Sequence, residues 1–276
     1  MSYLVGFAEF IFSPILILWR HRRLIGLLVK REVEAKYKGS LLGLLWMIAM
    51  PAAMLCVYTV VFGLVFQSHW PDQIGEGITV TALYIFSGLI LFTIFSENIG
   101  RAPGLVLENT AYVKKLVFPL EILPWVSIFS SLVPAAVSFL VFLALYFVTF
   151  GMPPWTALLL PILVLPLILI VAGLSWILAA LGVFFRDLRH VMGIVVMVTM
   201  FSAPLFFSMS AVPSQLRPYF AINPMLIPLE ASKNFLFRGS IAIPGNFWLY
   251  LVIAWVTAAF GRYAFARLRW GFADVV

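Results

Sequence analysis

The residues of this chain that could do chemistry are few and lie far apart. The three histidines, His21, His69 and His190, fall in different segments, and Cys56 is the one cysteine. A single thiol excludes an internal disulfide and two-thiol redox chemistry within one subunit. No H-E-x-x-H pattern or carboxylate pair occurs in an apolar segment, so hydrolysis or glycosyl transfer within a membrane has no evident residues.

Glu97 is the best candidate for an ionisable residue that acts inside an apolar segment. Ion-coupled carriers expose their mechanism as such residues. Arg101 follows four residues later, which is the spacing of an ion pair on one helix face. We expect Glu97 and Arg101 to pair near a membrane interface, and an ion-coupled secondary transporter stays an alternative.

Nucleotide binding by this chain has no sequence support. No G-x-x-x-x-G-K-[ST] pattern occurs, so the sequence contains no Walker A loop to cradle phosphates, and any ATP must bind another chain. The chain is instead rich in aromatic residues, with 26 Phe, 9 Trp and 9 Tyr. Each taken singly is typical of lipid contact or interfacial anchoring, and together they could stack on sugar rings.

The composition indicates the class of protein to which this chain belongs. The 276 residues are 63% hydrophobic and 11% charged, with a mean hydropathy of +1.08. Soluble domains are about 45–50% apolar and about 25% charged. A soluble globular protein is therefore excluded, and the predicted fold class is an all-α integral membrane protein.

Apolar runs of about 20 residues predict six transmembrane helices. They are expected near residues 41–66, 78–99, 122–150, 155–182, 191–210 and 246–266, which gives an N-terminal segment over 1–40 and a six-helix domain over 41–276. With the N-terminus inside, all of the 18 Lys and Arg residues except Arg217, Lys233 and Arg238 fall on the cytoplasmic side. The net charge of +7 is thus explained by the membrane topology, and nucleic-acid binding is not needed to explain it. Both termini are expected in the cytoplasm.

Three further segments are expected to have structure of their own. Residues 20–38 form an amphipathic helix with Ile25, Val29 and Val33 on its apolar side, suited to anionic lipid or to a docking partner. Residues 101–124 contain a short helix that Pro119 ends, and form either a corner that receives force or an interfacial turn. The proline-interrupted stretch 208–244 predicts short re-entrant or interfacial helices on the outer side, as a gate or a surface lid.

Several of these segments match a known family. The sequences REVEAKYKGSLLGLLWMIAMP (31–51), YVKKLVFPLEILP (112–124), LGVFFRDLRH (181–190), INPM (222–225) and GFADV (271–275) occur in an order that resembles the membrane subunit of ABC-2-type polysaccharide exporters. That family includes O-antigen, capsule and wall teichoic acid permeases. The YKGS and KKLVFP forms look closer to O-antigen and teichoic acid permeases than to the capsule branch.

The resemblance implies a partner set and a location. It implies a homodimer with two separate ATPase chains, embedded in lipid of the bacterial inner membrane, that exports a lipid-linked polysaccharide from the cytoplasmic leaflet. ATP and Mg²⁺ would be held by the partner ATPase, and this chain would bind no cofactor itself.

The resemblance also implies roles for individual residues. ATPase docking carries over to Arg31, Tyr37, Lys38, Glu108, Lys114, Lys115 and Pro119. In such exporters the first and fifth spans form most of the conduit wall. The resemblance therefore implies that Trp46, Tyr58 and Phe201 line the conduit. Arg186 and Asp187 would tie the corner after the fourth span to cytoplasmic loops or lipid phosphates, or simply mark the cytoplasmic side.

Overall fold

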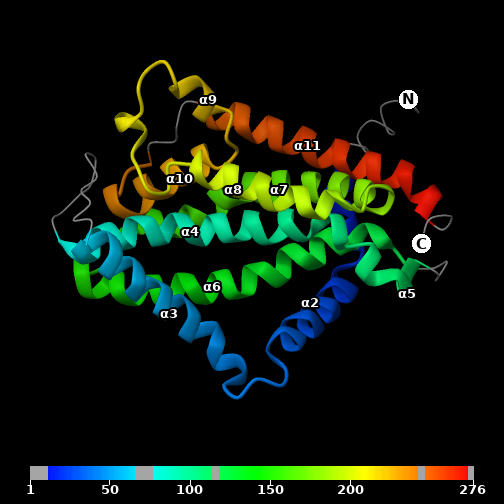
Figure 1. Cartoon of the computed structure of the whole chain (residues 1–276), viewed down its shortest axis with the longest axis horizontal. Helices are drawn as coiled ribbons and strands as arrows, with labels where there is room; N and C mark the ends of the chain where they lie inside the picture. Colours follow the sequence, from blue (N-terminus) through cyan, green and yellow to red (C-terminus); the bar gives the residue numbers. More distant parts are fainter. Residues whose placement is uncertain (1–11, 66–76, 114–117, 242–245, 273–276) are drawn as a thin grey trace.

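The computed structural model describes residues 12–65, 77–113, 118–241 and 246–272, and all regular structure in these ranges is helical. Five helical segments are long and apolar enough to cross a membrane: Gly43–Val65, Ile78–Gly104, Leu120–Phe150, Trp155–Phe184 and Phe247–Gly271. The last four run side by side as an elongated bundle, and the first, Gly43–Val65, leaves it at an angle (Figure 1). Each lies within a few residues of an expected span, because a run of apolar residues near 20 long is an unambiguous signal.

The predicted span over 191–210 is shorter in the structure than expected. Its helix, α8, covers Leu188–Phe201, which is 14 residues. At 1.5 Å per residue it is about 21 Å long, less than the roughly 30 Å of a hydrocarbon core. Residues 202–208 continue as turns and bends, with Pro204 inside them, and proline there lacks the backbone donor that a longer helix would need.

Helix α4 (Ile78–Arg101) is the most buried of the long helices and contacts most of the others. It packs against α6 (Leu123–Phe150), α7 (Leu160–Phe184), α8 and α10 (Leu226–Lys233). Its apolar side chains, among them Leu83, Ile85 and Phe95, form the core with those of α6 and α7.

Helices α7 and α11 (Phe247–Leu268) pack closely through two glycines. A Cβ on Gly261 would collide with the carbonyl oxygen of Gly173, and one on Gly173 would collide with the backbone at Thr257. Small residues at such positions let membrane helices approach until their backbones touch. This pair forms one side of the bundle (Figure 1).

The N-terminal helices touch the bundle on one side of it. Helix α2 (Arg22–Tyr37) contacts α6, and α3 (Trp46–Tyr58) contacts α6 and α4. The turn between α2 and α3 lies away from α4 and α6 (Figure 1). A helix is present within the predicted segment 20–38, over Arg22–Tyr37, and its Ile25 is buried. Helix α3 is the least buried of the long apolar segments, and a π-helical stretch, Thr59–Val65, continues it.

The segment after α4 contains the expected short helix. Two 3-10 turns, Ala102–Gly104 and Leu107–Asn109, lead into α5 (Thr110–Val113), and a third turn, Leu120–Ile122, opens α6. At the opposite end of the bundle from α5, the proline-rich segment after α8 forms α9 (Arg217–Ala221) and α10, and α10 packs into the bundle against α4 and α7 (Figure 1). Proline at 213, 218, 224 and 228 keeps these helices short.

Candidate functional site

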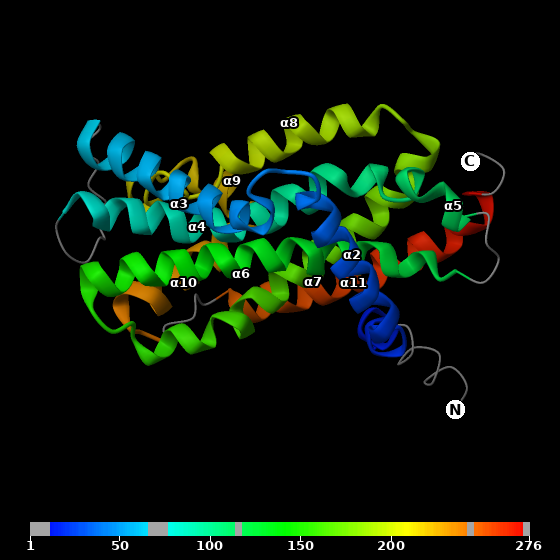
Figure 2. The ribbon, with the colours of Figure 1, turned by 90° about the horizontal axis from the view of Figure 1, so that it is seen from below.

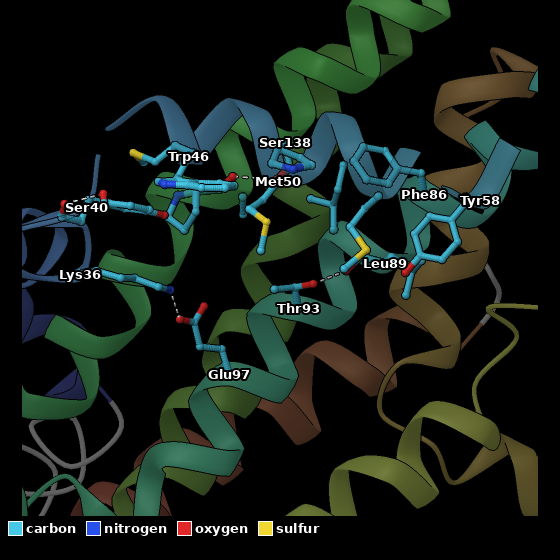
Figure 3. A pocket seen from close by; sticks show the side chains of 17 residues that line it. Lys36, Ser40, Trp46, Met50, Tyr58, Phe86, Leu89, Thr93, Glu97 and Ser138 are labelled. Carbon is cyan, nitrogen blue, oxygen red and sulfur yellow. Dashed lines mark hydrogen bonds and ion pairs between the residues drawn. The ribbon is translucent and has the colours of Figure 1, made fainter. Parts of the chain in front are cut away.

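A cavity of about 610 Å³ lies between α2, α3, α4 and α6, and a second of about 380 Å³ adjoins it. The two cavities share Lys36, Tyr37, Glu97 and Pro134 in their walls. They lie where α2 and α3 diverge from α6 and meet at a turn away from the bundle (Figure 1). The walls of the larger cavity are drawn in Figure 3.

One face of α3 forms the apolar wall. Trp46, Met50, Met54 and Tyr58 follow each other at four-residue intervals and so lie on one side of the helix. Phe86 on α4 lies on the wall toward Tyr58 (Figure 3). Methionine side chains adapt to irregular ligands, and aromatic faces suit apolar chains and sugar rings. Trp46 and Tyr58, both predicted conduit residues, are thus in one cavity wall.

An ion pair closes the opposite end of this cavity. The Lys36 ammonium on α2 binds the Glu97 carboxylate on α4, and both side chains remain partly exposed (Figure 3). Ser40 and Thr93 lie nearby, and their hydroxyls donate to carbonyls of Tyr37 and Leu89 at 3.1 and 2.8 Å. The cavity is therefore apolar along α3 and polar where α2 meets α4, as an amphipathic molecule requires.

The predicted pair between Glu97 and Arg101 is wrong. In the described structure Glu97 pairs with Lys36, and Arg101 pairs with Glu32 of α2 and with Glu108, whose Oε2 lies 3.3 Å from Arg101 Nε. The prediction considered only spacing along one helix, whereas α2 folds back and offers each residue a partner of opposite charge. Glu32 also accepts a hydrogen bond of 3.1 Å from Ser130 on α6.

Arg101 therefore connects three segments. Through Glu32 it holds α2, and through Glu108 it holds the turn Leu107–Asn109, while its own backbone ends α4. A second contact also joins α2 to the segment after α4, because Arg31 of α2 donates a hydrogen bond of 3.2 Å to the hydroxyl of Tyr112 in α5. The Tyr112 ring in turn stacks on Phe118, with ring centroids 4.2 Å apart. The two segments predicted to dock an ATPase thus touch each other.

A buried polar group beneath this network was not predicted from the sequence. The Asn98 amide donates to Ile94 O at 2.7 Å and to Ser131 Oγ at 2.8 Å, and its carbonyl accepts from Ser127 Oγ at 2.8 Å. Each of these polar atoms has a hydrogen-bond partner. The group therefore fixes α4 against α6 and leaves none of these atoms buried without a hydrogen bond, which would cost free energy. The S-x-x-x-S spacing of Ser127 and Ser131 on one helix face was the available signal.

Glu121 was also missed. Its carboxylate lies 3.7 Å from Arg262 and 3.5 Å from Arg269, and its carbonyl accepts from Trp176 Nε1 at 2.9 Å. These contacts join the start of α6 to α7 and to the end of α11. The loop that begins with Arg101 is consequently anchored at both of its ends.

The other predicted residues are placed as follows. Tyr37 lines both cavities, Lys38 is exposed just after α2, and Pro119 precedes the turn that opens α6. Lys114 and Lys115 lie outside the described residues. Arg186 and Asp187 are exposed at the corner between α7 and α8, where the Asp187 carbonyl accepts from His190 N at 3.0 Å.

Phe201 is not part of the cavity that Trp46 and Tyr58 line. It ends α8 and is 61% exposed. Helices α3 and α8 both flank α4 along the same edge of the bundle (Figure 2). Both helices carry exposed apolar side chains outside the cavity wall, with Leu44, Ile48 and Val57 on or just before α3, and Ile194, Val198 and Phe201 on α8.

Similar proteins place this architecture in a family. The family model described as ABC-2 type transporter matches residues 23–237. The O-antigen export system permease protein RfbA of Myxococcus xanthus is 28% identical over 211 residues, which is 76% of this chain and 78% of that protein. An RfbA permease of Klebsiella pneumoniae is 23% identical over 92% of this chain and 95% of its own length. The polysialic acid transport protein KpsM of Escherichia coli is 25% identical over 77% of this chain and 80% of its own length.

The matched region contains α2 from Arg23 onward, all of the residues that line the two cavities, and the Arg101 ion pairs. A multi-pass helical chain with no Walker A motif in its sequence fits the transport component of such systems rather than the ATPase. The chain belongs to the ABC-2 type transporter family, as a membrane permease subunit.

Proposed function

We propose that this chain is the membrane subunit of an ATP-driven exporter that moves a lipid-linked polysaccharide, of the O-antigen class, from the cytoplasmic leaflet of the bacterial inner membrane outward. The observation that carries the proposal is its similarity to an O-antigen permease over 92% of this chain and 95% of that relative. Capsular polysaccharide is the second candidate glycan, because KpsM matches as well. Export of teichoic acid by the same mechanism is a further alternative, and an ion-coupled secondary transporter ranks below these exporters.

The proposed topology has six crossings with both termini in the cytoplasm. Helix α8 together with residues 202–210 makes the fifth crossing, since the irregular stretch adds the length that α8 lacks. Irregular backbone at membrane depth is tolerated where protein buries it, and Ala203 and Leu205 are fully buried here. The segment 208–244 then holds re-entrant helices at the outer side, residues 1–40 form an N-terminal cytoplasmic segment, and residues 41–276 form the transmembrane domain.

A second copy of the chain would complete the conduit. The exposed apolar sides of α3 and α8 on one edge of the bundle support a homodimer through these helices. The cavity that Trp46 and Tyr58 line would then open toward the conduit, and Phe201 would face it from α8. Stacking on such aromatic side chains lets sugar rings slide because it has little positional specificity.

Two separate ATPase subunits, which would hold ATP and Mg²⁺, dock on α2 and the segment 101–124. Arg31, Tyr37, Lys38, Glu108 and Pro119 are the proposed docking residues, with Lys114 and Lys115 beside them in the sequence. Arg186 and Asp187 are proposed to contact a cytoplasmic loop or lipid phosphates from the neighbouring corner.

The coupling follows from the contacts of Arg101. A push on the docking segments by the closing ATPases would move α2, α4 and the turn at Glu108 together, because Arg101 links all three. The movement would separate α3 from the bundle at the cavity and widen the conduit. For ATP to drive this, the ATP-bound state must differ in free energy between the closed and open conduit.

Deletion of the encoding gene in its native cell tests the glycan class. The proposal predicts that lipid-linked O-antigen accumulates on the cytoplasmic side, that surface O-antigen is lost, and that the intact chain restores both. Accumulation of a capsular glycan instead would move the assignment to the second candidate. Normal surface glycans of every class would contradict polysaccharide export.

A further inference from the structure

A recess of about 650 Å³ lies between α2 and α6, on residues that the exporter proposal does not use. Helix α2 crosses α6 obliquely there and then diverges from it (Figures 1 and 2). The Trp125 indole, which donates to Pro14 O at 3.2 Å, fixes the helical residues 12–20 that precede α2 against the start of α6. This hydrogen bond joins the N-terminal helical residues to α6 near the recess.

Each helix contributes one apolar stripe to the recess. Leu18, Ile25, Gly26 and Val29 recur at helical spacing on the N-terminal side. The facing stripe on α6 runs over Phe129, Leu132, Val133, Ala136, Val137 and Leu140. A Cβ placed on Gly26 would meet no atom within 4 Å, so the glycine leaves room for an occupant. Since α6 belongs to a span, the recess borders the hydrocarbon of the membrane.

One charged residue, Arg22, lines the recess. Its guanidinium lies 4.5 Å from the ring centroid of Trp19, which is 70% exposed. Arg20 and Arg23 are its neighbours in the sequence, and within the described residues Arg22 has no ion pair with an acidic side chain. Arginine and tryptophan together are typical of the level of lipid headgroups. This end of the recess is therefore complementary to a phosphate.

The apolar part of the recess continues around α6. Leu132 and Ala136 also line a neighbouring recess of about 480 Å³ between α4, α6 and α7. The two apolar recesses meet at Leu132 and Ala136, and Arg22 lines one of them. A molecule with one phosphate and two hydrocarbon chains can place its phosphate on Arg22 and one chain in each recess. A polyisoprenyl carrier has a single chain, and a protein helix has no counterpart for the second recess.

We propose that this recess binds an anionic diacyl phospholipid, with its phosphate on Arg22 and its acyl chains on α6. A bound lipid of this kind would hold α2 at the membrane surface. The site is separate from the cavity between α2, α3, α4 and α6, so it does not depend on which glycan is exported.

The test is native mass spectrometry of the full chain, purified in mild detergent and supplied with phosphatidylglycerol or phosphatidylethanolamine. The wild-type chain is expected to retain one phospholipid and to prefer phosphatidylglycerol by about fivefold, the effect of roughly one cation near a lipid phosphate. Arg22→Gln is expected to lose this preference. Gly26→Phe and Ala136→Phe fill the recess from its two sides and are expected to lose the retained lipid.

Leu27→Phe is the matched control, because Leu27 is exposed on α2 outside the recess and the added ring is the same. It is expected to retain lipid like the wild type. Size-exclusion profiles and melting temperatures select the recess variants that fold. Retention of phosphatidylglycerol at the wild-type level by either folded recess variant would overturn the proposal, as would an unchanged preference in Arg22→Gln or retention of a polyisoprenyl phosphate in place of phospholipid.

Discussion

Arg101, the last residue of α4, forms an ion pair with Glu32 of α2, 69 positions earlier in the chain. Its Nε also lies 3.3 Å from the Glu108 carboxylate, so that one guanidinium connects α2, α4 and the segment after α4. Those are the segments on which an ATPase is proposed to act. Because a mechanical link needs only a few contacts at the right place, Arg101 is the residue at which coupling can best be tested.

Arg101→Gln is expected to reduce glycan export severalfold with little loss of stability. Each ion pair is partly exposed, and such pairs contribute about 0.2–1 kcal/mol. Export at the cell surface and ATP hydrolysis are measured on the same preparation, and the variant should hydrolyse ATP without matching export. Lys30→Gln is the control, since Lys30 pairs with Glu34 on the exposed side of α2. Wild-type export by Arg101→Gln would refute the link.

Glu97→Gln separates the exporter from an ion-coupled carrier. Glu97 pairs with Lys36 at the polar end of the cavity, where both side chains are partly exposed. Loss of this pair is expected to leave at least half of the export, because a partly exposed pair contributes about 1 kcal/mol or less. Export is measured with and without a dissipated proton gradient. An ion-coupled carrier would instead lose transport in the variant and on dissipation.

Gly182→Ala is expected to displace the turn Ala102–Gly104 from α7. A Cβ at Gly182 would collide with the backbone of Pro103, and overpacking of this kind costs about 1–3 kcal/mol. The loss should appear as a lower melting temperature in detergent and as reduced export. Gly193→Ala is the matched control, because a Cβ there meets nothing within 4 Å in helix α8. Equal behaviour of the two variants would show that the Gly182 contact has no consequence.

Asn98→Ala is expected to destabilise the packing of α4 on α6. It leaves the buried hydroxyls of Ser127 and Ser131 with fewer partners, and polar contacts between membrane helices contribute about 0.6 kcal/mol on average and up to about 1.7. Thermal unfolding in detergent measures the loss. Ser138→Ala serves as the control, because the Ser138 hydroxyl donates to Pro134 O within α6. An unchanged melting temperature for Asn98→Ala would contradict this account.

The long helices could be predicted because apolar runs near 20 residues have one common solution in a membrane. Helix α8 could not be bounded in this way, since the apolar run over 191–210 does not reveal that the chain leaves the helix at Ser202 and turns before Pro204. The amphipathic pattern likewise predicted α2 but not its direction. Whether such a helix lies on lipid or folds onto a span depends on its fit to α6, which is a tertiary property.

The candidate site shows the same limit. The resemblance pointed to the wall residues Trp46 and Tyr58, but the partners of Glu97 and Arg101 required the position of α2 relative to α4. The sequence also offered no reason to join Glu121 to Arg262 and Arg269, more than 140 positions away. Local spacing predicts contacts within a helix, whereas each of these ion pairs forms between elements.

The central claim is that this permease works with a separate ATPase. Its most direct test is purification of the intact chain from its native membrane in mild detergent, with mass spectrometry of co-purifying proteins and assay of ATP hydrolysis. The account predicts a stoichiometric Walker-motif ATPase, and lower recovery of that ATPase when Arg31 and Glu108 on the docking segments are replaced together. A chain that purifies without any ATPase, and whose transport is indifferent to nucleotide but follows an ion gradient, would contradict it.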